Sequence, residues 1–117
     1  MKPSPPRASP FLAFDLLATL VAVVRGDGQV LFANAALEDA IGLSRRSIEG
    51  APLPDCFTEP AVLRHALQGA NTNEFAALRY DAQLKRVHHE PLPVHVIVAQ
   101  TERAGEIIVE LLPLEAQ

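Results

Sequence analysis

The residues that could carry chemistry in this 117-residue chain are one cysteine and four histidines. Cys56 cannot form an intrachain disulfide, and a single thiol fits a reducing compartment. His88, His89 and His95 could bind zinc only if a loop and a strand converge, and adjacent histidines on an extended strand point to opposite faces. We therefore expect Cys56 to be a small, partly buried hydrophobe and these three histidines to be solvated.

No motif of enzyme chemistry accompanies these residues. The serines lack a Gly-x-Ser-x-Gly elbow. Gly26-Asp27-Gly28 lacks the glycine and lysine that follow in a phosphate-binding loop. We therefore predict that the chain is not an enzyme and has no catalytic residue and no bound metal.

Composition and charge argue against a disordered chain, a nucleic-acid-binding protein and a membrane protein. Hydrophobic residues make up 49% and charged residues 21%, which is ordinary globular usage for a single domain. A formal net charge of -4 gives no attraction to nucleic acid or to anionic membranes. The longest uncharged apolar run, Leu16–Val24, is far shorter than the roughly 20 residues of a membrane helix. We expect a cytoplasmic, soluble domain.

The elements that would position these residues begin after a proline-rich start. Residues 1–9 are predicted to be a flexible leader, and residues 10–117 a single domain. Ser9 and Pro10 are typical of a helix start, which predicts an apolar helix over Pro10–Thr19. Such a helix must be buried, on its own domain or against a second copy. The candidate homodimer contact consists of Phe11, Leu12, Phe14 and Leu16.

A hairpin and two short helices are predicted next. The apolar run Leu20–Val24 is typical of a strand covered on both faces, and Gln29–Ala33 returns as its partner. Asn34 is a favoured N-cap of a helix that ends at Gly42, and a second helical turn, Arg45–Glu49, starts at Ser44. The structural motif of this half comprises Gly26, Asp27, Gly28, Asn34, Gly42 and Gly50.

The second half predicts one helix and three strands. The helix starts at Thr58 and Pro60, after a connector over 51–57, and ends before Gly69. The strands are Glu74–Tyr80, Val94–Gln100 and Glu106–Leu112, with Leu84–Pro93 as a polar loop containing prolines. Helices gathered between two runs of antiparallel strands indicate an α+β fold with helices on one face of the sheet.

These elements, in this order, resemble a PAS domain. The resemblance rests on LVAVV, Gly26-Asp27-Gly28, QVLFA, Asn34, ALEDAIG and the Ile48-Glu49-Gly50 closure, and it covers residues 10–113. It implies a five-stranded antiparallel sheet in the order 2-1-5-4-3, with helices on one face and a flanking N-terminal helix.

A closer resemblance is to the N-terminal PAS domains of bacterial nitrogen-regulation sensor histidine kinases, the NtrB family. It rests on the stretches FANAALEDAIGLSRRSIEGAPLPD and GEIIVELLPLEAQ. This implies a regulatory module of a cytoplasmic two-component system, acting in dimerisation and signal transmission. The kinase core would lie outside this chain, and the response regulator and the PII protein would act through the parent protein. His88-His89-Glu90 superficially echo the phospho-accepting context of such kinases, but they lie beside Pro91 and Pro93, which do not belong in a long helix.

Single residues indicate whether the chain could bind either of two cofactors found in PAS-class sensors, flavin and haem. Flavin-binding members place their adduct-forming cysteine three residues after the glycine that matches Gly50, and that position is Leu53 here. Haem-binding members carry an axial ligand on the third helix, where His65 lies, but no other haem feature is present. We therefore predict no cofactor.

The last candidate site is a pocket between the sheet and the helices. With one tyrosine and no tryptophan, a large aromatic cofactor has little to stack on, so we interpret this region as a filled core. Two alternatives stay open: a sensor that binds a small metabolite or cofactor, and a free-standing protein-interaction domain. The predicted lining residues are Val21, Val23, Leu31, Ala33, Leu37, Ile41, Leu63, Leu67, Val96, Val98, Ile107 and Val109.

Overall fold

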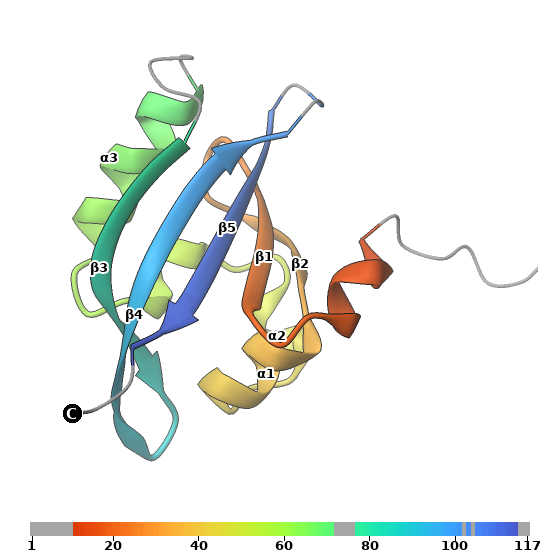
Figure 1. Cartoon of the computed structure of the whole chain (residues 1–117), viewed down its shortest axis with the longest axis vertical. Helices are drawn as coiled ribbons and strands as arrows, with labels where there is room; N and C mark the ends of the chain where they lie inside the picture. Colours follow the sequence, from red (N-terminus) through yellow and green to blue (C-terminus); the bar gives the residue numbers. More distant parts are fainter. Residues whose placement is uncertain (1–10, 72–76, 102, 104, 115–117) are drawn as a thin grey trace, which may run out of the picture.

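The computed structural model describes residues 11–71, 77–101, 103 and 105–114. Five antiparallel strands form one sheet in the order β2-β1-β5-β4-β3, which confirms the predicted topology. The helices α1, α2 and α3 lie on one face of this sheet (Figure 1). The predicted leader over 1–9 and the predicted strand start at Glu74 lie outside the described residues.

The first half is a hairpin that leads directly into a helix. Strands β1 (Leu20–Arg25) and β2 (Val30–Ala33) are joined by a turn in which Gly28 has φ +94°, a conformation that favours glycine. Helix α1 (Ala35–Ile41) begins after Asn34 and ends at Gly42, whose φ is 85°. The short helix α2 (Arg45–Ile48) follows.

The N-terminal helix is shorter than the sequence predicts. Only a five-residue 3-10 helix, η1 (Leu12–Leu16), is present, and Leu17 is already extended. The physical reason is the Asn34 side chain. The carbonyl oxygens of Phe14 and Thr19 accept hydrogen bonds from the Asn34 side chain, which fixes the chain on both sides of Leu17 to the domain. The Phe14 carbonyl also accepts the last 3-10 bond, from the N–H of Leu17.

The middle of the chain also differs from the prediction. The connector contains a second 3-10 helix, η2 (Leu53–Cys56), and α3 (Pro60–Asn71) continues through Gly69. Gly69 is buried and does not have positive φ, so it does not act as a helix terminator.

The prediction of a loop over Leu84–Pro93 is wrong. Strands β3 (Ala77–Arg86) and β4 (His89–Gln100) form one long hairpin, and β5 (Glu106–Pro113) pairs with β4. The pairing of β4 with β5 starts at Val94, so Pro91 and Pro93 lie beyond the end of β5. Few ladder hydrogen bonds therefore need the N–H groups that these prolines lack.

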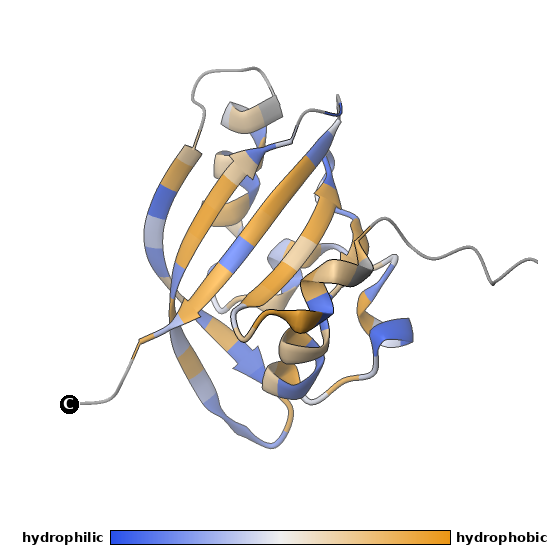
Figure 2. Cartoon of the chain, turned by 45° about the vertical axis from the view of Figure 1, so that its right-hand side comes forward, coloured by the Kyte–Doolittle hydropathy of each residue, from blue (hydrophilic) through white to orange (hydrophobic). Residues whose placement is uncertain are grey.

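The core lies between the sheet and the helices. The apolar colouring in Figure 2 runs along the central strands β1, β5 and β4. One contiguous cluster of buried side chains, none more than 4% exposed, joins both layers. Its members are Leu20, Ala22, Val24, Val30, Ala33, Leu37, Ile41, Ile48, Leu53, Phe57, Leu63, Ala66, Leu67, Ala70, Leu84, Val94, Val96, Val98, Ile107, Val109 and Leu111.

Candidate functional site

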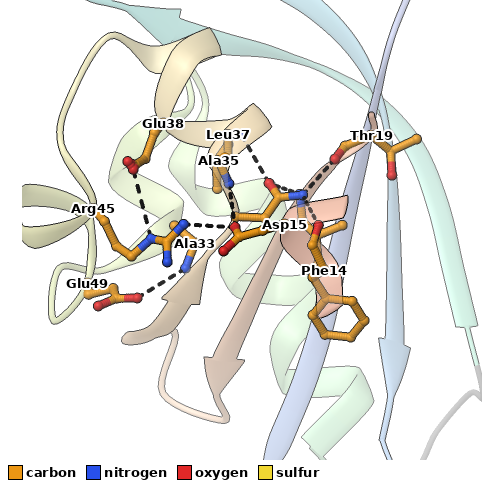
Figure 3. Close-up of polar contacts among 11 residues, drawn as sticks. Phe14, Asp15, Thr19, Ala33, Ala35, Leu37, Glu38, Arg45 and Glu49 are labelled. Atoms are coloured by element: carbon orange, nitrogen blue, oxygen red, sulfur yellow. Dashed lines mark hydrogen bonds and ion pairs between the residues drawn. The ribbon is translucent and has the colours of Figure 1, made fainter. Parts of the chain in front are cut away.

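Asn34 is the buried polar residue from which the candidate site is built. Its side-chain oxygen accepts hydrogen bonds from the backbone N–H groups of Val21 and Leu37, at 3.0 Å each. Its amide nitrogen donates to the carbonyl oxygens of Phe14, at 2.9 Å, and Thr19, at 2.8 Å. The side chain is fully buried, and all four of its hydrogen-bonding positions are used. One residue therefore ties the N-terminal segment to β1 and α1 (Figure 3).

Asp15 makes a second connection from the same segment. Its carboxylate oxygen accepts from the backbone N–H of Ala35, the first residue of α1, at 2.8 Å. The Arg45 guanidinium on α2 donates to the same oxygen at 2.8 Å and lies 3.8 Å from a Glu38 carboxylate oxygen. The carboxylate at a helix N-terminus also interacts favourably with the helix dipole. Asp15 therefore links η1 to both short helices (Figure 3).

Aromatic contacts cover the polar links. The rings of Phe11 and Phe14 lie 5.7 Å and 6.4 Å from the ring of Phe32 on β2. The Arg45 guanidinium lies 4.9 Å from the centre of the same Phe32 ring, within cation–π range. The segment 11–19 is thus fastened to the domain by both apolar and charged contacts. We call the set formed by Phe14, Asp15, Thr19, Asn34 and Arg45 the N-terminal latch.

This arrangement can hold a flanking segment in one position, but it offers no group placed to react. The sequence predicts Asn34 as an N-cap, and the structure adds the two donor bonds to Phe14 and Thr19. The pairing of Asp15 with Arg45 was missed. The available signal was that Asp15 is the single charged residue in an otherwise apolar stretch.

The predicted pocket lining needs correction at three positions. Leu31 is 39% exposed and lies at an irregularity in the pairing of β1 with β2. Val21 and Val23 are buried on the opposite face of the sheet, because they alternate with Leu20, Ala22 and Val24 of the core cluster. The other predicted positions all belong to that cluster: Ala33, Leu37, Ile41, Leu63, Leu67, Val96, Val98, Ile107 and Val109.

The candidate dimer contact is also changed by the structure. Phe11 and Phe14 pack on Phe32 of their own chain, so they are engaged within the domain. The side chain of Leu12 lies outside the described part. Leu16, by contrast, is 88% exposed and Leu17 is 45% exposed.

The cysteine and the histidines are dispersed. Burial raises the pKa of the Cys56 thiol; Asp55 raises it further, and Lys85 partly offsets both. His65 is exposed on α3, and His88 and His89 are exposed at the tip of the β3–β4 hairpin. His95 donates to an Asp81 carboxylate oxygen across the two strands, at 2.8 Å. Within the described ranges, no group of three or more His, Cys, Asp or Glu side chains could hold a metal ion.

The glycines of the structural motif set backbone geometry. Gly28, Gly42 and Gly50 have positive φ, which favours glycine. Asp27 accepts a hydrogen bond from the backbone N–H of Gln29 and closes the hairpin turn. Among the helices described, none has the length and apolar character needed to cross a membrane.

The solved structures that resemble this chain share the PAS fold. The PAS domain of the nitrogen regulation protein NR(II) from Vibrio parahaemolyticus is 20% identical, with a TM-score of 0.66, over 92% of this chain and 100% of that chain. The PAS domain of the RpfR quorum-sensing receptor from Cronobacter turicensis, in complex with BDSF, is 14% identical, with a TM-score of 0.73, over 85% and 96%.

A third similar structure is a domain of a sensory box sensor histidine kinase/response regulator from Geobacter sulfurreducens. It is 16% identical, with a TM-score of 0.70, over 81% of this chain and 82% of that chain. No protein-family model matches the sequence, and no curated protein matches it. At these identities the likeness establishes the fold, so the chain has the PAS fold.

Proposed function

We propose that this chain is the regulatory PAS module of a cytoplasmic two-component sensor histidine kinase of the nitrogen-regulation type. Its role is to dimerise and to transmit a conformational bias to a kinase core outside this chain. The response regulator and the PII protein act through that parent protein. The chain itself carries no catalytic step.

The observation that carries the proposal is the N-terminal latch. A segment that only led into the domain would need no fully buried asparagine with four hydrogen bonds. Transmission between distant sites requires an element whose position both sites can bias. In this proposal segment 11–19 is that element, because its contacts tie its position to those of β1, α1 and α2.

The sheet supplies a path from this segment to the C-terminal strand. Leu20, which follows the segment directly, is paired with Leu111 on β5. Strand β5 ends at Pro113, two residues later in the chain. A displacement of segment 11–19 would therefore reach the end of β5 through one strand-to-strand contact.

The dimer contact in this proposal is Leu16 together with Leu17. Both side chains are exposed, whereas the neighbouring phenylalanines are used within the domain. Large exposed apolar side chains that lie next to each other are typical of an interaction surface when they form a patch.

The test of this contact is the light-scattering mass of the purified chain and of the Leu16→Asp/Leu17→Asp variant. Both positions are exposed, so the variant should keep its fold and show an unchanged far-ultraviolet circular dichroism spectrum. We expect its light-scattering mass to be lower than that of the wild type, because the contact at Leu16 and Leu17 is lost. The matched control is Leu43→Asp, which changes another exposed leucine, 40% exposed, and should leave the mass unchanged. Equal masses for all three proteins would refute the contact.

One observation favours the alternative of a small-molecule sensor. The Tyr80 hydroxyl is buried and has no hydrogen-bond partner within the described part of the chain. A buried unpaired hydroxyl is costly, and a bound ligand could satisfy it. Native mass spectrometry of the purified chain distinguishes the two functions. A stoichiometric bound molecule that is lost in Tyr80→Phe would establish the sensor and remove the need for a purely mechanical role.

A further inference from the structure

Strand β3 is an edge of the sheet that is only half covered. It is the last strand in the order, with β4 on one side. On its other side the backbone N–H of Thr58 donates to the carbonyl of Gln83, and Phe57 bridges Leu84. No described residue outside β4 makes a backbone hydrogen bond with residues 77–82. An uncovered strand edge is a template for pairing with another strand.

The backbone direction along this edge follows from the bond at Gln83. In an antiparallel ladder the N–H and C=O of one residue point to the same side, and successive residues alternate. Because the Gln83 carbonyl points away from β4, the backbone groups of Arg79 and Asp81 point away from it too. These two residues can therefore offer donors and acceptors to an added strand.

The charges on this edge are complementary to a second copy. Charged residues on an edge normally prevent self-pairing, because like charges meet. Here Arg79 and Asp81 flank Tyr80, so antiparallel pairing centred on Tyr80 places each Arg79 opposite the Asp81 of the other copy. The Asp81 side chain is 70% exposed even while it accepts from His95. Arg79 is exposed and forms no ion pair among the described residues.

The shape of the edge agrees with this register. A groove of about 300 Å³ lies between the start of α3 and residues 81–83 of β3, and Val62 and Ala82 contribute to its lining. Pairing centred on Tyr80 places Leu78 of the second copy opposite Ala82. The small alanine leaves room beside it, and Val62 is 43% exposed. The half-buried Leu78 would thus be covered on dimerisation.

We propose that β3 pairs with β3 of a second copy of this chain, antiparallel and centred on Tyr80, to give one continuous sheet. This contact goes beyond the proposed function. It is separate from the contact at Leu16 and Leu17, which precede β1, three strand positions away across the sheet. A chain with both contacts could associate beyond the dimer.

The test is charge exchange, measured by sedimentation velocity over a dilution series in the Leu16→Asp/Leu17→Asp background. That background removes the other contact, so we expect a dimer held by β3 alone. Arg79→Asp sets like charges opposite each other twice and should raise the dimer Kd about tenfold or more. Arg79→Asp/Asp81→Arg exchanges the two charges and should restore dimerisation. The matched control is Arg46→Asp, an exposed arginine on α2, which should have no such effect.

A monomeric background at every concentration would overturn the proposal, as would failure of the exchange to restore pairing. A cross-link provides a second, independent measurement. Directly opposite Cβ atoms lie about 4.5–5.5 Å apart in such a pair, so Tyr80→Cys with Cys56→Ser should form an intermolecular disulfide under mild oxidation. Arg103→Cys with Cys56→Ser is the control and should cross-link more slowly. Equal rates would also overturn the proposal. The failure of this contact leaves the Leu16 and Leu17 test unaffected.

Discussion

Replacing Asn34 is the sharpest perturbation that the structure suggests. In Asn34→Ala the buried N–H of Val21 loses its acceptor and the carbonyl of Thr19 loses its donor. The Leu37 N–H keeps the backbone carbonyl of residue 34, and the Phe14 carbonyl keeps the N–H of Leu17, so these two groups lose one of two partners. Each buried unsatisfied group costs about 1–3 kcal/mol, and the partly accessible carbonyls cost less because water reaches them. We expect the free energy of unfolding to fall by about 2–3 kcal/mol. This is a large part of the roughly 5–15 kcal/mol of a typical domain.

Asn34→Asp separates the latch from simple helix capping. Asparagine and aspartate are about equally good N-caps, so a residue that only capped α1 would tolerate the change. In the latch, the amide nitrogen faces two carbonyl oxygens, and a carboxylate oxygen there would face them without a hydrogen atom. We therefore expect Asn34→Asp to lower stability by about 2 kcal/mol or more.

Urea denaturation followed by circular dichroism measures both variants against the wild type. The matched control is Ser44→Ala, because Ser44 precedes α2 but makes no side-chain capping bond. Its free energy of unfolding should stay within about 0.5 kcal/mol of the wild type. If Asn34→Asp were as stable as the wild type, the account of Asn34 as a four-way connection would be refuted.

Two further predictions concern charge and titration. Asp15→Asn keeps an acceptor for the Ala35 N–H but removes the ion pair with Arg45, so we expect a loss of about 0.5–1 kcal/mol that shrinks in high salt, whereas Asp27→Asn at an exposed pair should change little. Burial raises the pKa of Tyr80 to about 12. Since the pKa of an unfolded tyrosine is about 10, the contribution of Tyr80 to stability is complete below that pH and is lost as the pH rises towards 12. Tyr80 is the only tyrosine and tryptophan is absent, so absorbance at 295 nm reports it alone; a native titration near 10 would contradict its burial.

The sequence predicts the ends of the elements in the first half because each end has a local cause, whereas the order of the strands follows from the resemblance to PAS domains. Asn34 and Gly42 delimit α1, and the Gly26-Asp27-Gly28 turn joins β1 to β2. These signals depend on backbone conformation and on short-range hydrogen bonds, which are readable from residue type.

The predictions that were wrong share one physical cause. In each case the structure depends on contacts between residues that are far apart in the sequence. Strand β1 is apolar at every position from Leu20 to Val24, so alternation cannot tell which residues face the helices. The structure assigns Leu20, Ala22 and Val24 to the core cluster and places Val21 and Val23, also buried, on the opposite face of the sheet. Similarly, the register of β3 on β4 makes a hairpin of a proline-containing stretch that looks like a loop.

The N-terminal latch could be predicted only in part. The preference of Asn34 for an N-cap is local, but its partners Phe14 and Thr19 lie 20 and 15 positions before it in the sequence. The ion pair between Asp15 and Arg45 spans 30 positions. Residue types alone do not show that residues so far apart in the sequence are in contact.

In the proposed function, segment 11–19 is a regulatory element of a histidine kinase. The most direct measurement is autophosphorylation by the protein encoded by the whole reading frame that contains this chain, with and without Leu16→Asp/Leu17→Asp. We expect transfer of the ATP γ-phosphate to a histidine, at a rate that the double substitution changes several-fold while the domain stays folded. A reading frame without kinase activity, or an unchanged rate in the variant, would contradict the proposed function.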